Sequence, residues 1–304
     1  MAMRTPPLLR SKIRCWHCQG AVFTRQGLEA DTDINSGGML VNKLTETLIN
    51  ARLLFRGRPI RVSLENAPIY TVSDGDTQIK ICRQGRYNRY KRGIKHGIDA
   101  LASDYHLDTL EGLDGGTFID CGANVGELGI WAKSRNMKYI AFEPEHFEAD
   151  CCDQNNYGGK ALTIRKALWK ETTTLEFFHK ADTADSSAFS VRDYSSKTFV
   201  PATRLDDELD PTKLSHPLVL KLEAEGAEPE VLEGAAGCVA AADYVAVDCG
   251  YERGPNQDHT FIEVNNFLSH IGFRIVAANF KGRLTVLFHR SGHKSNTTSE
   301  QGEV

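Results

Sequence analysis

Two apolar runs, with a turn of small residues after the first, constrain the fold of this chain more than any other feature. The first run, at 117–121, leads into Gly-Ala-Asn-Val-Gly at 122–126, and the second, at 138–143, ends in an acid. Adjacent parallel strands with this layout form a nucleoside-binding crevice at their carboxyl ends. Glu143 follows Gly122 by roughly 20 residues, the interval at which a carboxylate accepts hydrogen bonds from ribose hydroxyls. The sequence therefore predicts a ligand that carries a ribose.

The turn at 122–126 favours S-adenosylmethionine over a dinucleotide. Dinucleotide-binding turns need a second glycine so that the backbone can approach the pyrophosphate, and Asn124 stands at that position. S-adenosylmethionine carries ribose, adenine and an amino-acid tail but no phosphate. Asp120 is expected near the tail, where a carboxylate can hold the ammonium group directly or through water. An NAD-dependent dehydrogenase is the alternative enzyme.

The expected cofactor site extends from the turn to the end of the third strand. We expect adenine to lie there against a backbone amide and an apolar face. The predicted cofactor-binding residues are Asp120, Gly122, Ala123, Asn124, Gly126, Glu143, Pro144, Ala167 and Leu168.

Strand and helix patterns alternate from about residue 115, which predicts an α/β sheet with helices on both faces. The expected strands are 117–121, 138–143, 162–167, 217–222, 244–249, 273–278 and 283–289, and the expected helices lie near 126–135, 145–156, 228–241 and 259–271. The last two strands are joined by a connection too short for a parallel crossover, so they must form an antiparallel hairpin. This outline predicts a Rossmann-like class I methyltransferase fold, with a mostly parallel seven-stranded sheet and an antiparallel final strand.

An N-terminal α+β extension is expected to precede this fold. Apolar residues at helical spacing predict a helix, and three short strands and a second helix follow it; the helix residues are Leu40, Leu44, Leu48, Ala51 and Phe55. The predicted domains are therefore 1–110 for the extension, 111–290 for the methyltransferase domain and 291–304 for a disordered tail. Cys15 and Cys18 lack a second pair at zinc-finger spacing, so a structural zinc is not expected.

A basic stretch between Arg83 and Lys95 contains no acid and is interleaved with two tyrosines. Such a run is usually a solvated helix face, which is the interpretation that we favour. The alternative is that its arginines bind a phosphorylated or carboxylated acceptor.

Four ordered motifs resemble the FkbM methyltransferase family. They are Phe-Ile-Asp-Cys-Gly-Ala-Asn-Val-Gly-Glu at 118–127, Ala-Phe-Glu-Pro at 141–144, Thr-Arg-Leu-Asp-Asp-Glu-Leu at 203–209 and Leu-Lys-Leu-Glu-Ala-Glu-Gly-Ala-Glu-Pro-Glu-Val-Leu-Glu-Gly-Ala at 220–235. The resemblance spans roughly residues 115–250. It implies an S-adenosylmethionine-dependent O-methyltransferase that acts on a hydroxyl of a sugar, a glycan end or a similar small polar acceptor. Glu223 departs from the family pattern, which usually has Asp at this position.

Acidic residues follow the strand at 217–222, on the side where open α/β sheets place their ligand crevice. The predicted catalytic residues are Lys221, Glu223 and Glu225, with one of the two glutamates as the general base. A divalent cation bound by Glu223, Glu225 and Asp248 is a second possibility, because it would lower the pKa of the acceptor hydroxyl. For Glu228 we expect a structural role at the start of the next helix.

A formal net charge of -4 argues against a nucleic-acid partner held by bulk positive charge, although RNA ribose methylation is an alternative based on the basic stretch. No apolar run approaches the roughly 20 residues that span a bilayer, and the first residues lack a secretory core. We therefore expect a cytoplasmic protein without a membrane span. The oligomeric state is open, and so is the hypothesis of an inactive nucleoside-binding or interaction module.

Overall fold

The computed structural model describes residues 34–180, 186–187 and 194–291. The chain divides into two compact units, Met1–Leu40 and Val41–Val304. The part of the predicted extension that follows Leu40 thus belongs to the same compact unit as the α/β part, and the domain boundary at residue 110 stays a prediction. Cys15, Cys18 and nearly all of the predicted disordered tail lie outside the described residues.

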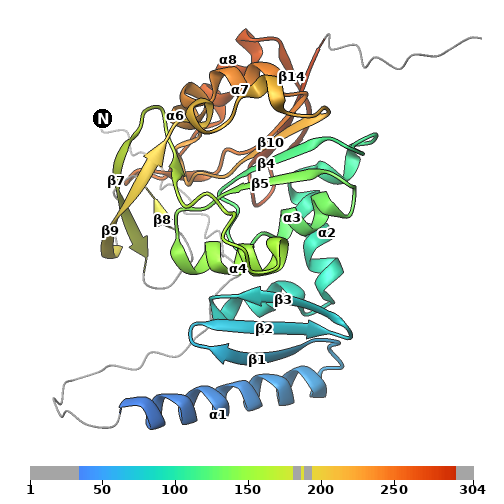
Figure 1. Ribbon diagram of the computed structural model, residues 1–304, viewed down its shortest axis with the longest axis vertical. Helices are drawn as coiled ribbons and strands as arrows, with labels where there is room; N and C mark the ends of the chain where they lie inside the picture. The colour runs from blue at the N-terminus through green and yellow to red at the C-terminus, as the bar shows by residue number, and fades with distance from the viewer. Residues whose placement is uncertain (1–33, 181–185, 188–193, 292–304) are drawn as a thin grey trace, which may run out of the picture. The chain divides into compact units, whose positions relative to one another are not determined.

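The central sheet has six strands in the described part of the chain, in the order β14-β15-β11-β10-β4-β5 (Figure 1). Its strands are β4 (Thr117–Cys121), β5 (Lys138–Phe142), β10 (Leu218–Leu222), β11 (Tyr244–Asp248), β14 (Phe273–Asn279) and β15 (Thr285–Arg290). Strands β5, β4, β10 and β11 are parallel, whereas β15 runs antiparallel to both of its neighbours. The predicted Rossmann-like methyltransferase fold with its C-terminal hairpin is confirmed.

The prediction of a seventh strand at 162–167 is wrong in the described structure. At this edge of the sheet Ile164 forms an isolated parallel bridge with Phe142. The amide of Lys166 then bonds back to the carbonyl of Ile164, at 2.9 Å, which turns the chain away from β5. The next two residues form β6 (Ala167–Leu168), which pairs with a different sheet.

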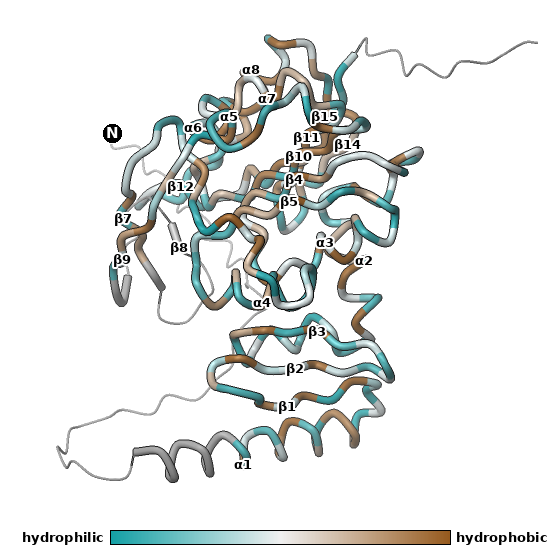
Figure 2. Tube along the Cα trace, viewed as in Figure 1, coloured by the Kyte–Doolittle hydropathy of each residue, from teal (hydrophilic) through white to brown (hydrophobic). Residues whose placement is uncertain are grey.

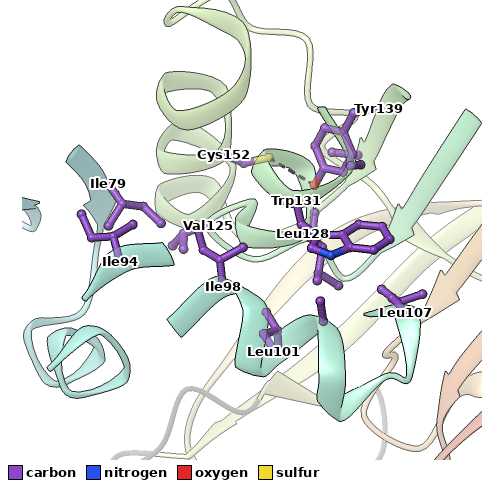
Figure 3. Packing of buried hydrophobic residues seen from close by; sticks show 14 of the residues in the cluster. Ile79, Ile94, Ile98, Leu101, Leu107, Val125, Leu128, Trp131, Tyr139 and Cys152 are labelled. Carbon is purple, nitrogen blue, oxygen red and sulfur yellow. Dashed lines mark hydrogen bonds between the residues drawn. The ribbon is translucent and has the colours of Figure 1, made fainter. Parts of the chain in front are cut away.

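Alternate residues of the central strands face two separate apolar cores. One core lies against α2 (Ile94–Asp104), α3 (Glu127–Lys133) and α4 (His146–Tyr157), and Figure 3 shows its packed side chains. The other lies against α5 (Leu205–Glu208), α6 (Glu228–Gly234), α7 (Ala236–Ala241) and α8 (Phe261–His270). Figure 2 shows the central strands as largely hydrophobic, as expected for parallel strands covered on both faces.

The helix predicted at 228–241 is divided into α6 and α7 at Ala235. The Asp206 carboxylate accepts hydrogen bonds from the amides of Gly237 and Cys238, at 2.8 and 2.9 Å. These amides belong to the first turn of α7, where backbone donors lack partners within the helix. A carboxylate from a distant segment therefore starts a second helix, which the local pattern does not reveal.

Residues 173–203 contain a β-sheet that the sequence analysis did not predict. Strand β7 (Thr173–Lys180) pairs antiparallel with β8 (Ser186–Ser187) and β9 (Tyr194–Thr203), and β6 joins β9 in parallel. The sheet buries a small apolar cluster that includes Phe177 and Val200. It lies beside the carboxyl end of the central sheet and contributes to the site described below.

The segment before the central sheet has the predicted helix–strand–helix order. It contains α1 (Ile34–Phe55), an antiparallel sheet of β1 (Arg61–Asn66), β2 (Ile69–Asp74) and β3 (Thr77–Ile81), the 3₁₀ helix η1 (Gln84–Tyr90), and α2. The Asn155 side chain of α4 bonds to both the amide and the carbonyl of Lys80, at 2.7 and 3.0 Å, and so satisfies the edge of β3. No helix in the described ranges is long and apolar enough to cross a membrane.

Candidate active site

The turn after β4 is built from residues that tolerate left-handed backbone. Gly122, Asn124 and Gly126 have φ of 72°, 49° and 81°. A Cβ on Gly122 would lie 2.2 Å from the Glu223 carbonyl oxygen, so the turn packs directly on the loop after β10. Asparagine is one of the few other residues that visits this region readily. The predicted tight turn is therefore present, and it lies at the carboxyl end of the sheet.

Glu143 is 5% exposed and lies directly after β5. One of its carboxylate oxygens accepts from the amide of Asn124, at 2.8 Å, and the other from the amide of Glu145, at 2.9 Å. Burial raises the pKa of Glu143 to about 7, although these two hydrogen bonds favour the charged form. A carboxylate oxygen can accept more than one hydrogen bond, so the Glu143 carboxylate can accept further hydrogen bonds from a ligand.

A cavity lies between this turn and the β6–β9 sheet. Its volume is about 800 Å³, which includes space open to solvent. Six of the predicted cofactor residues line it: Gly122, Asn124, Glu143, Pro144, Ala167 and Leu168. Ala123 and Asp120 line an adjoining cavity instead, and Gly126 packs behind the turn against Asn156. Phe177 and Arg83 also line the first cavity, and sequence analysis did not place either there.

The adjoining cavity is lined mainly by charged side chains of both signs. It shares Gly122, Asn124, Glu223 and Glu225 with the first cavity, so these residues lie at the boundary. Its charged lining residues are Arg86, Arg89, Asp120, Glu127, Lys221, Glu223, Glu225, Glu252 and Arg283. The first part of the crevice thus combines apolar surface, from residues such as Leu168 and Phe177, with charged side chains, whereas the second part is lined mainly by charged side chains.

Lys221 is 2% exposed and fixes the end of β4 to the end of β10. Its ammonium donates to the carbonyl oxygens of Cys121 and Gly122, at 3.1 and 2.8 Å, and lies 3.0 Å from Asp120 and 3.2 Å from Glu223. Asp120 also accepts from the Tyr139 hydroxyl, at 2.9 Å. These contacts make Lys221 a positioning residue for the turn, since its donors are engaged by the chain itself.

Arg283 binds two of the predicted metal ligands. Its guanidinium forms ion pairs with Glu223 and with Asp248, and its carbon centre lies 5.1 Å from the Tyr105 ring. Within the described residues no group of three His, Cys, Asp or Glu side chains is placed to hold a metal ion. The geometry therefore gives no support to the predicted cation site, because an arginine compensates the carboxylates that a cation would need.

The loop after β10 holds Glu225 at the boundary between the two cavities. Glu225 has a φ of 50°, which is unfavourable for a glutamate. Glu228 supports the loop by accepting from the amides of Ala224 and Gly226, at 2.9 and 3.2 Å, and from the Thr260 hydroxyl. The structural role expected for Glu228 is thus confirmed, and the strained backbone of Glu225 is maintained by its neighbours.

The basic stretch is a solvated face only in part, because Arg92 and Lys95 are exposed whereas Arg86 and Arg89 pair with a buried acid. Arg86 makes a bidentate pair with Glu127, at 3.0 and 2.8 Å, and Arg89 lies 3.7 Å from the same carboxylate. Glu127 is 1% exposed and also accepts from the Tyr90 hydroxyl, at 2.7 Å. The two arginines reach the acidic first turn of α3, which the local run of basic residues could not reveal.

The family model for the methyltransferase FkbM domain matches residues 120–275, which is half of the chain. The chain belongs to the FkbM family of S-adenosylmethionine-dependent methyltransferases. The matched range includes the turn after β4, Glu143 and the loop after β10.

Solved structures resemble this FkbM chain at low identity. An FkbM methyltransferase from Methylobacillus flagellatus matches with 16% identity and a TM-score of 0.39, over 58% of this chain and 44% of that one. This chain therefore spans less than half of that protein. Magnesium protoporphyrin IX methyltransferase from Synechocystis, with S-adenosylmethionine bound, matches with 11% identity and a TM-score of 0.38, over 87% of this chain and 100% of that one. Comparison with curated proteins gives no match.

The residues of the first cavity in this FkbM chain fit S-adenosylmethionine. Glu143 is a buried acceptor of the kind that ribose hydroxyls would need, and Leu168 and Phe177 are apolar lining residues of the kind that adenine would need. In the second cavity the buried Asp120 carboxylate lies 3.0 Å from the Lys221 ammonium and accepts from the Tyr139 hydroxyl, at 2.9 Å. Asp120 would therefore interact with the ammonium group of the amino-acid tail in addition to Lys221.

Proposed function

We propose that this chain transfers the methyl group of S-adenosylmethionine to a hydroxyl oxygen of a sugar, a glycan end or a similar small polar acceptor. The proposal is supported by one observation above all. Two cavities of different chemistry meet at Glu223 and Glu225. The first cavity offers apolar surface for adenine and a buried carboxylate for ribose, and the charged cavity suits an acceptor with many hydroxyls, which can donate to carboxylates and accept from arginines.

S-adenosylmethionine, when bound, supplies a methyl carbon that is reactive because it is attached to a positively charged sulfur. The chain has to hold the acceptor oxygen in line with that carbon and to take the hydroxyl proton. Glu225 lies at the boundary of the two cavities and is the base that we propose. Glu223 already has its charge compensated by Lys221 and Arg283, so we assign it a positioning role.

The proposal is tested by incubating the protein with methyl-labelled S-adenosylmethionine and extracted cellular glycans and metabolites. We expect a labelled product whose label resists mild alkali, because an O-methyl ether is stable under those conditions. Label released as methanol would indicate a methyl ester and overturn the assignment to a hydroxyl. Cofactor binding without any labelled product across the extracts would favour the inactive binding module.

A further inference from the structure

Helix α1 carries a stripe of apolar side chains that the described residues leave exposed. Leu44 and Leu48 are both 63% exposed, and Phe55 is 92% exposed. These three residues and Ala51 are spaced by four, three and four positions, so they lie on one face of the helix. Leu54, which is 64% exposed, lies beside this face. Apolar side chains grouped in this way on a surface mark an interaction site.

The opposite face of α1 is fixed to the β1–β3 sheet. Asn50 bonds to both the carbonyl and the amide of Val62, at 2.7 and 2.8 Å, and Glu46 accepts from the amide of Leu64, at 3.1 Å. Leu53 is 3% exposed and belongs to the main apolar core. Figure 1 shows α1 lying along β1. The helix cannot rotate its apolar stripe toward the sheet without breaking these contacts.

Basic side chains gather at the end of α1, next to the stripe. Arg52, Arg56 and Arg58 are exposed, and Lys91 lies over the Tyr87 ring, 5.5 Å from its centre. Partial burial and then repulsion by the three arginines lower the pKa of Lys91, so the four charges lie within electrostatic range of one another. Among the described residues no carboxylate forms an ion pair with any of the four. Positive charge grouped in this way attracts an anionic partner.

We propose that α1 docks on an anionic lipid bilayer, lying in the plane of the surface. The leucines and Phe55 would enter the boundary between headgroups and acyl chains, and the arginines would contact lipid phosphates. The combination of an apolar stripe with a basic flank fits this partner better than either feature alone. The inference does not depend on the proposed methyl transfer.

A second copy of the chain is a weaker candidate for the same face. The stripe from Leu44 to Phe55 covers about 18 Å of helix. A stable dimer buries roughly 800 Å² on each partner, which is more than one short stripe can supply. The basic cluster would also face its own copy in many such pairings, and like charges repel.

The test is flotation of the full-length protein with phosphatidylcholine vesicles that contain or lack phosphatidylglycerol. We expect binding to the anionic vesicles, loss of binding at high salt, and at least tenfold weaker binding to pure phosphatidylcholine. The double substitution Leu48→Glu and Phe55→Glu should abolish binding. Each of Arg52→Ala and Arg56→Ala should weaken it about fivefold.

Two matched variants control for general effects of exposed residues. Phe199 is 73% exposed on β9, and Lys281 is exposed in the β14–β15 connection. Phe199→Glu and Lys281→Ala should bind anionic vesicles like the wild type. The proposal would be overturned if the control variants lost as much vesicle binding as the α1 variants, or if the wild type did not float with the vesicles. So would a dimer in gel filtration that Leu48→Glu dissociates without any vesicle binding. Stabilisation by S-adenosylhomocysteine shows in each variant that the fold is retained.

Discussion

Glu143 combines a structural role with a proposed binding role, and its charge is sensitive to pH. Burial raises its pKa to about 7. Ribose hydroxyls donate to the ionised carboxylate, so below this pH the proton must be lost before the cofactor binds well. We predict that affinity for S-adenosylhomocysteine falls up to tenfold per unit as pH drops below about 7, and calorimetric titration between pH 8 and pH 5.5 measures this.

The matched variant for this prediction is Glu143→Gln, which cannot ionise. Its affinity should be lower at pH 8 and should not change with pH over the same range. A pH profile of the variant that parallels that of the wild type would assign the titration to another group. Glu143→Ala should abolish binding.

Glu225 is predicted to act in turnover and not in cofactor binding. Glu225→Gln removes the proton acceptor while keeping the size of the side chain, so we expect kcat to fall at least 100-fold. The dissociation constant for S-adenosylhomocysteine should stay within threefold of the wild type. The control is Glu230→Gln, because Glu230 pairs with Arg253 outside both cavities, and it should keep most of its activity. Full activity of Glu225→Gln would show that the base is misassigned.

Local motifs predicted the part of the first cavity that the turn and the acid after β5 form, because short-range sequence fixes both, but they did not predict Phe177 or Arg83. The charged second cavity was predicted only in part. Arg283 and Arg86 reach the site from segments far from the motifs, and their partners Asp248 and Glu127 are set by tertiary packing. A run of basic residues carries no signal for the acids that it will meet.

At the level of a single element, we predict that the β4–α3 turn does not tolerate a side chain at Gly122. Gly122→Ala would place a Cβ 2.2 Å from the Glu223 carbonyl oxygen, on a backbone with a φ of 72°. We expect this variant to lose about 2 kcal/mol or more of stability and to lose stabilisation by S-adenosylhomocysteine. Thermal unfolding with and without the ligand measures both.

Gly158→Ala separates the steric clash of the added Cβ from the cost of a left-handed backbone. Gly158 ends α4 with a φ of 63°, but a Cβ there would meet nothing within 4 Å. This variant should lose about 1 kcal/mol from the left-handed backbone alone and should keep its response to the ligand. Equal behaviour of the two variants would contradict close packing of the turn on the loop after β10.

The elements that were predicted have a clear apolar pattern or a short connection. Examples are the strands on either side of the turn and the C-terminal hairpin. The β6–β9 sheet was missed because its sequence mixes polar and apolar residues, and its strands are identified by pairing. The segment 162–167 was predicted as a strand, yet its backbone turns away from β5 after one bridge at Ile164. The strand propensity of a segment does not determine how many residues pair with the neighbouring strand.

For the whole molecule, the Arg86–Glu127 pair joins η1 to α3. Glu127 is buried, which alone would raise its pKa, but Arg86 and Arg89 hold the pKa of Glu127 at about 2. Its unfolded value is 4.5, so the ion pair contributes stability that is present above about pH 4.5 and is lost as pH falls toward 2. Glu127→Gln should cost about 3 kcal/mol at pH 7 because it leaves Arg86 uncompensated.

The predicted pH dependence is tested by measuring the free energy of unfolding of the wild type and of Glu127→Gln between pH 7 and pH 2.5. The difference between them should shrink as pH falls below about 4.5. Asp99→Asn is the control, since Asp99 pairs with an exposed lysine and should cost no more than about 0.5 kcal/mol. A difference that stays constant or grows in acid would contradict the pairing.

The proposed function depends on the identity of the ligand in the first cavity. Calorimetric titration of the full chain with S-adenosylhomocysteine and, separately, with NAD measures it most directly. We predict saturable binding of S-adenosylhomocysteine at one site, absent in Glu143→Ala, and no binding of NAD. Binding of NAD in place of S-adenosylhomocysteine, or unchanged S-adenosylhomocysteine binding by Glu143→Ala, would contradict the account.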